Sequence, residues 1–167
     1  MKNTTKRIIF GILIILNCAT IFYFSNQVAD DSSEQSSRVV ELVSNVIPSI
    51  KNMQEPERTK LKEEVLTPIV RKTAHFSIYA MLGIWTINFI DTFENLKTSK
   101  KTMISLIFCM LYAITDELHQ TLVSGRSGEI RDVLIDTIGT LTGMMLILLI
   151  NKIIQRIRQN NKEIKAK

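Results

Sequence analysis

Several residues and motifs that mark common protein classes are scarce or absent in this chain. Its 167 residues include two cysteines, too few for the disulfide framework of a small secreted protein. Cys18 and Cys109 both fall in apolar runs, where we expect them to pack in the interior. HExxH, GxSxG, Walker and dinucleotide-binding motifs are all missing, so the sequence gives no support to the enzyme classes that these motifs define.

Strand-like alternation, internal repeats and low-complexity tracts are also missing, and four apolar stretches dominate instead. They cover residues 8–24, 69–90, 102–123 and 130–150, and each approaches the roughly 20 residues that a helix needs to cross a bilayer. The first follows Lys6 and Arg7, contains no charge and has no small-residue cleavage site, so we expect a retained span, with a processed signal peptide as the minor alternative. The sequence predicts an all-α, four-helix transmembrane bundle forming a single domain over residues 1–167.

The charges between the stretches predict an orientation. Basic residues gather at the start, at residues 93–101 and in the tail at 151–167, which places both termini in the cytoplasm. Residues 25–68, which carry more acidic than basic side chains, would then form a partly helical extracytoplasmic segment. The net charge of +5 fits attraction to anionic membrane lipids, and we expect no nucleic-acid partner.

Ionisable residues occur in or beside three of the predicted spans, at a similar depth near the outer face. Because charge is costly in hydrocarbon, such residues are candidates for a functional site. We predict proton transfer by His75, Asp116, Glu117 and His119, anion binding by Arg71, Lys72 and Arg126, and supporting roles for Tyr79, Gln120, Asp132 and Asp136.

Two other interpretations of this polar layer stay open. The histidines and neighbouring carboxylates are ligand types for a divalent metal, but no metal-binding spacing is present, so no metal site is predicted and the cofactor is left unknown. The charged groups could also neutralise one another and merely hold the helices together. Gly139 and Gly143 form a GxxxG pair, which predicts close helix packing within the chain or between two copies in a homo-oligomer.

The polar residues also resemble a known family. RKTAHF at residues 71–76, Tyr79, YAITDELHQ at 112–120, Gly125-Arg126 and DVLID at 132–136 with Gly139 resemble the VanZ-like membrane proteins in order and spacing. FSNQ at residues 24–27 is similar to that family's segment after the first span. Ser124 departs from the pattern, because a proline commonly precedes this Gly-Arg pair in the family.

The resemblance implies a multi-pass protein of the bacterial cytoplasmic membrane, related to a teicoplanin-resistance protein. We therefore expect a role in antibiotic resistance or in the cell envelope, through an outer-leaflet site that binds or modifies an anionic lipid-linked head group. Expected partners are membrane lipids and a lipid-linked envelope precursor or a lipoglycopeptide. The alternative is a non-catalytic protein whose polar network only holds the helices together, so enzymatic activity is left open.

Overall fold

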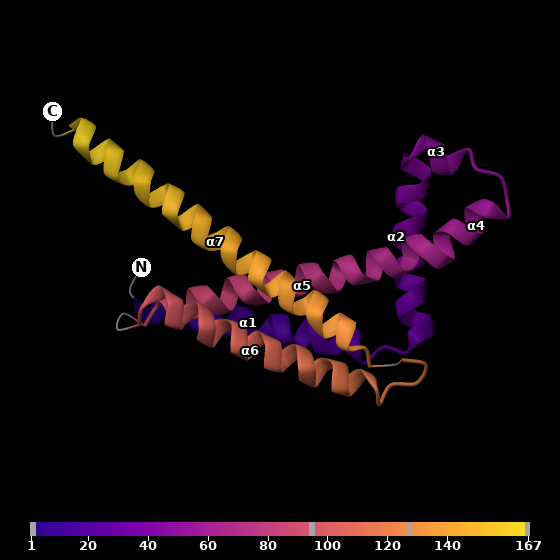
Figure 1. The fold of residues 1–167 in the computed structure, drawn as a ribbon, viewed down its shortest axis with the longest axis horizontal. Coiled ribbons are helices and arrows are strands. Elements are labelled where there is room, and N and C mark those ends of the chain that lie inside the picture. The colour runs from indigo at the N-terminus through magenta and orange to yellow at the C-terminus, as the bar shows by residue number, and fades with distance from the viewer. Residues whose placement is uncertain (1–2, 94–95, 127, 166–167) are drawn as a thin grey trace.

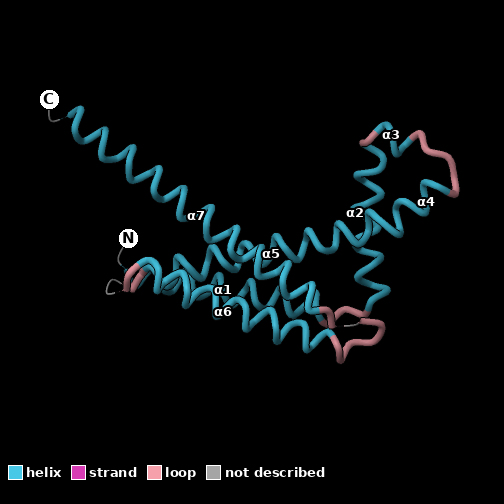
Figure 2. Tube along the Cα trace, in the orientation of Figure 1, coloured by secondary structure: helices cyan, strands magenta, loops and turns pink. Residues whose placement is uncertain are grey.

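The computed structural model describes residues 3–93, 96–126 and 128–165, and every regular element in these ranges is helical (Figure 2). The elements are α1 (Asn3–Ser25), α2 (Ala29–Val46), α3 (Pro48–Lys51), α4 (Glu57–Leu61), the π-helical turn η1 (Lys62–Leu66), α5 (Thr67–Asp91), α6 (Thr98–Gln120) and α7 (Ile130–Lys165). The all-α prediction is therefore confirmed. Helix α7 continues through the predicted basic tail as far as it is described, and residues 166–167 of that tail lie outside the described ranges.

Among the described helices, α1, α6 and α7 are long and apolar enough to cross a membrane. They coincide with three of the four predicted spans and fit a membrane protein. Helix α5 covers the remaining predicted span and has 25 residues, so its length is sufficient. Its composition sets it apart, because polar side chains such as Arg71, Lys72 and His75 occupy its first turns.

A π-helical turn joins the outer segment to α5 without a break in the helical path. Pro68, at the start of α5, has no N–H to donate, and its ring would clash with a carbonyl one turn earlier in a regular helix. In η1 the backbone widens, so that the N–H of Thr67 bonds the carbonyl of Lys62, which also accepts the Thr67 hydroxyl at 2.9 Å. The proline is thus accommodated, and α4, η1 and α5 form one continuous rod.

The long helices pack side by side around α5 (Figure 1). Helices α1, α6 and α7 all contact α5, and α2 lies across its first half. The core between them contains Ile21, Tyr79, Leu82, Ile87, Cys109, Ala113 and Met144. The last part of α7 extends away from the other helices in Figure 1. The arrangement brings the end of α1, the start of α5, the end of α6 and the start of α7 to one end of the bundle.

Side-chain contacts fix α2 beside the rod. Lys62 donates a hydrogen bond to the Glu41 carboxylate, which also lies 3.8 Å from the guanidinium of Arg58. The hydrogen bond from Lys62 holds the pKa of Glu41 below its usual value. On the other face of α2, Val40 is buried. An amphipathic helix of this kind can cover one side of α5 while its charged side stays exposed.

Glycines let α5 and α7 approach at backbone distance. A Cβ atom added to Gly139 or Gly143 would overlap the backbone carbonyl of Phe76 or Ala80, respectively. On the facing helix, a Cβ on Gly83 would meet the backbone of Thr140. The predicted GxxxG pair thus packs within the chain in this structure, where α5 and α7 meet backbone against backbone.

This contact predicts that adding one methyl group destabilises the protein at Gly143 but not at Gly11. We expect Gly143→Ala to destabilise the folded protein by about 1–3 kcal/mol, because the new Cβ meets a backbone carbonyl that cannot rotate away. Gly11→Ala is the matched control, since its Cβ would lie 3.7 Å from the Phe89 ring, an ordinary contact. Thermal unfolding of both variants in the same detergent measures the difference. Equal midpoints would contradict the close contact.

Candidate functional site

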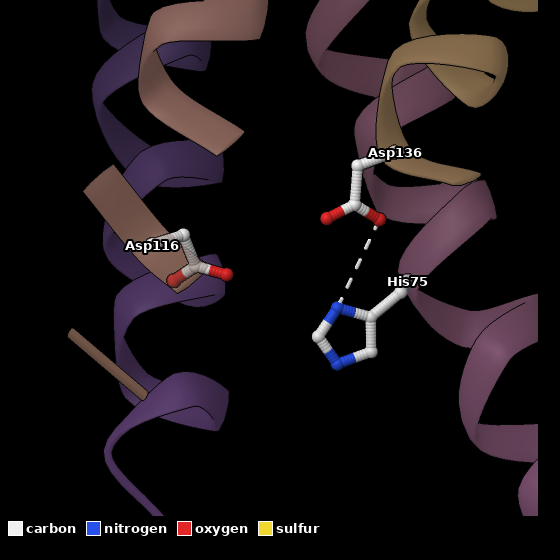
Figure 3. A group of neighbouring side chains, drawn as sticks. All are labelled: His75, Asp116 and Asp136. Carbon is white, nitrogen blue, oxygen red and sulfur yellow. Dashed lines mark ion pairs between the residues drawn. The ribbon is translucent and has the colours of Figure 1, made fainter. Parts of the chain in front are cut away.

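Three ionisable side chains from three helices meet in the bundle interior. His75 comes from α5, Asp116 from α6 and Asp136 from α7, and their side chains point toward one another (Figure 3). One ligand atom from each lies within 4.8 Å of those of the other two. Nδ1 of His75 is 4.0 Å from Oδ1 of Asp136, which is too long for a hydrogen bond. The three groups therefore lie close together, and no hydrogen bond joins any two of them in the described chain.

The two carboxylates of this cluster have different surroundings. Asp116 accepts a hydrogen bond of 3.1 Å from the Gln120 amide, which fixes its orientation from one turn away on α6. The Asp136 side chain is only 2% exposed, and no described group donates a hydrogen bond to its Oδ1. Leaving a buried polar atom unpaired costs about 1–3 kcal/mol, and more when the group is charged. Asp136 is the least satisfied member of the cluster.

Two cavities meet beside His75. A polar cavity of about 130 Å³ has a lining of two arginines, a histidine, two carboxylates, an amide and a glycine: Arg71, His75, Gln120, Gly125, Arg126, Glu129 and Asp132. An apolar cavity of about 210 Å³ lies between α1, α2 and α5, and it is lined by side chains that include Ile21, Phe24, Val39 and Ile78. Arg71, His75 and Arg126 belong to both linings. A row of basic side chains, two arginines and a histidine, thus lies between the polar cavity and the apolar cavity.

Arg126 reaches this position from the turn between α6 and α7. Gly125 supplies a φ of 77°, a conformation that other residues rarely adopt, and so allows the chain to turn just before Arg126. The Arg126 guanidinium donates a 3.2 Å hydrogen bond to the carbonyl of Phe24, whereas its buried Nε has no partner among the described residues. Burial, followed by the nearby positive charge of Arg71, lowers the pKa of Arg126.

The remaining predicted anion-binding residue has a different environment. The Lys72 ammonium lies 2.9 Å from the Asp132 carboxylate and 4.0 Å from that of Glu129, so it joins α5 to the start of α7. Within the described part of the chain, neither Arg71 nor Arg126 forms such an ion pair. The positive charge that is available to a ligand therefore belongs to the two arginines.

Two of the predicted proton-transfer residues lie outside the cluster. The Glu117 carboxylate accepts a hydrogen bond from the backbone N–H of Glu129 and so holds the turn before α7. His119 stacks on Phe22 of α1, with ring centroids 4.9 Å apart, and lines neither of the two cavities. Tyr79, predicted as a supporting residue, is fully buried, and its hydroxyl has no hydrogen-bond partner among the described residues.

Sequence reasoning missed the contribution of the outer segment to this site. Gln35, Ser36 and Val39 of α2 line the apolar cavity, and Phe24 at the end of α1 both lines it and accepts the bond from Arg126. The amphipathic pattern of α2 could show that one of its faces is buried. It could not show which helix covers that face, because this depends on the path of the connection between α2 and α5.

Comparison with known proteins gives one family match. A model of the family described as VanZ/LLP1 matches residues 10–151, which include every residue of the cluster and of both cavities. Neither the curated proteins nor the solved structures gave a match.

The contact between Glu117 and Glu129 predicts how the turn responds to mutation. Glu117→Ala removes the acceptor, and we expect hydrogen exchange of the Glu129 amide to accelerate about tenfold, as the loss of one net hydrogen bond implies. Glu117→Gln keeps a carbonyl oxygen at the same position and should preserve most of the protection. Hydrogen–deuterium exchange of the detergent-solubilised protein compares the variants. Equal exchange in both would show that the carboxylate does not hold the turn.

Proposed function

The chain belongs to the VanZ/LLP1 family, and from this premise we propose that it is a multi-pass membrane protein that binds the anionic head group of a lipid-linked ligand. The proposal places the two cavities at the outer leaflet of a bacterial cytoplasmic membrane. The head group would occupy the polar cavity, and the apolar cavity would accommodate the adjoining part of the hydrocarbon chain.

The observation that carries the proposal is the row of basic side chains shared by the two cavities. A lipid has its negative charge where the polar head joins the apolar tail, and Arg71 and Arg126 lie at the corresponding junction here. A guanidinium fork binds phosphate or carboxylate oxygens through two parallel hydrogen bonds. An anion between the arginines would also relieve their mutual repulsion and give the buried Nε of Arg126 a partner.

Apolar residues at the rim support access from the membrane. Phe24 and Val39 line the apolar cavity and are 41% and 46% exposed. Exposed apolar side chains are costly in water and favourable against acyl chains. A ligand that diffuses in the outer leaflet would therefore meet an apolar entrance first and the arginines beyond it.

The proposed placement requires α5 to be a fourth span with both termini in the cytoplasm. Helix α5 is surrounded by α1, α6 and α7, so its polar face points into protein and not into lipid. Lys97, Lys100 and Lys101 then lie on the cytoplasmic side between α5 and α6, as the positive-inside bias favours. All parts of the site are near the opposite, outer end.

Chemical modification of the head group is a further step that the site residues allow. His75 borders the polar cavity and lies beside Asp136, an arrangement that can accept and return a proton. Binding alone is the other form of the proposal. A purely structural network is the competing function, and it predicts no ligand selectivity.

Lipid binding to purified protein tests the proposal. We expect stronger binding of phosphatidylglycerol or a polyprenyl phosphate than of phosphatidylcholine, measured by native mass spectrometry from a neutral detergent. Arg126→Gln should weaken binding of the anionic lipids about tenfold, because a charged hydrogen bond of about 1.5–3 kcal/mol is lost. Arg156→Gln is the control, since it removes one charge from the exposed end of α7. Equal losses in both variants would show attraction by net charge alone and contradict the site.

Glycopeptide susceptibility tests the cellular role implied by the family. In a sensitive Gram-positive host, we expect wild-type protein to protect against teicoplanin, which carries an acyl chain, and not against vancomycin. Arg126→Gln at the same membrane level should lose this protection because head-group binding is weakened. Unchanged protection by the variant would detach resistance from the arginine site. Absence of protection by either form would contradict the resistance role and leave lipid binding to be judged by the purified protein.

A further inference from the structure

We propose that His75, Asp116 and Asp136 bind one divalent transition-metal ion, in the class of Zn²⁺ or Mn²⁺. One imidazole nitrogen and two carboxylate oxygens form a mixed ligand set of the kind that such ions accept. Three protein ligands leave at least one coordination position open, which is typical of catalytic sites and unlike the closed sites of structural zinc. The proposal rests on this geometry and is independent of the proposed lipid ligand.

The distances fit an ion at the centre of the cluster. Ligand atoms about 2.0–2.2 Å from one zinc ion are roughly 3.3–4.3 Å apart, depending on the angle between them. The His75 and Asp136 atoms are 4.0 Å apart, and all three ligand atoms lie within 4.8 Å of one another. Small rotations of the side chains close the remaining difference. A direct His75–Asp136 hydrogen bond would need a larger contraction of the same pair.

The unpaired oxygen of Asp136 is an independent indication of a ligand. It is buried, faces the His75 ring and has no hydrogen-bond donor among the described residues (Figure 3). Asp116 lies beside it, so two carboxylates share this interior. In the described chain neither forms an ion pair with a lysine or arginine, and the contact with His75 is long. A divalent cation would satisfy the orphan oxygen and offset the repulsion between the two carboxylates.

The surroundings hold the ligands as metal sites usually do. Each ligand belongs to a different long helix, and the glycine contact between α5 and α7 fixes the distance between His75 and Asp136. The Gln120 amide orients Asp116 by donating a hydrogen bond to its Oδ2, a type of outer contact that commonly tunes metal ligands. His75, one of the three ligands, also lines the polar cavity together with Gln120, so the metal site would adjoin the space beside Arg71 and Arg126.

An ion at this position would give the cavity a second means of holding an anion. The arginines would bind one side of a phosphate or carboxylate group, and the ion would bind an oxygen on the other side. The head-group ligand proposed above would then be shared between guanidinium groups and metal. This consequence rests on the proposed function, whereas metal binding itself does not.

A cobalt titration tests the site without any lipid. The full-length protein, purified in neutral detergent with a tag that lacks histidine and stripped with a chelator, is titrated with Co²⁺ as a spectroscopic substitute for Zn²⁺. We expect visible absorption from Co²⁺ bound at low symmetry, saturation at one ion per chain, and loss of the signal when Zn²⁺ is added. If folded wild-type protein shows no saturable signal, the proposal is wrong, and this outcome does not depend on the folding of any variant.

Variants assign the ion to the cluster. His75→Ala and Asp136→Asn should each weaken Co²⁺ binding by at least tenfold. His119→Ala controls for the other histidine of the chain, which stacks on Phe22, and Asp91→Asn controls for an exposed carboxylate that pairs with Lys101. Both controls should bind as the wild type does. Wild-type affinity in folded His75→Ala and Asp136→Asn, or an equal loss in the controls, would overturn the assignment.

Lipid measurements on the same samples separate the two proposals. If Co²⁺ binds and the lipids do not, the metal site stands and the head-group proposal fails. If phosphatidylglycerol binds the metal-free protein selectively and Co²⁺ does not bind, the head-group proposal stands and the metal-site proposal fails.

Discussion

The backbone contact between α5 and α7 is the constraint on which the site depends. Gly139 and Gly143 have no side chains, so α7 can lie against the backbone of Phe76 and Ala80, and Gly83 allows the same approach from α5. His75 immediately precedes Phe76, and Asp136 lies about one turn before Gly139 on α7, so the same contact sets both residues opposite each other. Side chains larger than hydrogen at these glycines would separate the helices and with them the two ionisable groups. The packing of α5 against α7 thus sets the distance between His75 and Asp136.

Much of the helical framework could be predicted because it depends on local composition. The uncharged run at residues 8–24 and the apolar run at 130–150 lie within α1 and α7, and the GxxxG pair is recognisable wherever it occurs. The position of α2 could not be predicted from local sequence, because contacts between residues distant in the sequence decide it.

His119 shows a second feature that the sequence could not give, the direction of a single side chain around its helix. Asp116, His119 and Gln120 share one broad side of α6, yet His119 and Gln120 differ by about 100° around the helix. Gln120 therefore bonds Asp116, and His119 stacks on Phe22 of α1.

The charged residues near the site divide into those that join parts of the fold and those whose charge has no ion-pair partner in the described chain. Lys72 with Asp132 joins α5 to α7, and Glu117 holds the turn through the backbone of Glu129. These contacts position the turn that carries Arg126 without using its charge. The arginines lie at the boundary between the apolar and polar cavities, while the carboxylate cluster lies behind them near His75. The two arginines thus border both cavities, whereas of the three clustered side chains only His75 does so.

Unsatisfied buried atoms are one criterion by which a ligand site differs from a network that only holds helices together. A structural network gains specificity when every buried member has a partner, and a partly satisfied one is less stable than apolar packing of the same volume. In the described part of the chain, Oδ1 of Asp136, Nε of Arg126 and the Tyr79 hydroxyl are all buried without hydrogen-bond partners. Each costs about 1–3 kcal/mol, which is large beside the net stability of a typical folded protein. The two proposals address the first two of these atoms, since a cation would pair with the Asp136 oxygen and an anion with the Arg126 Nε.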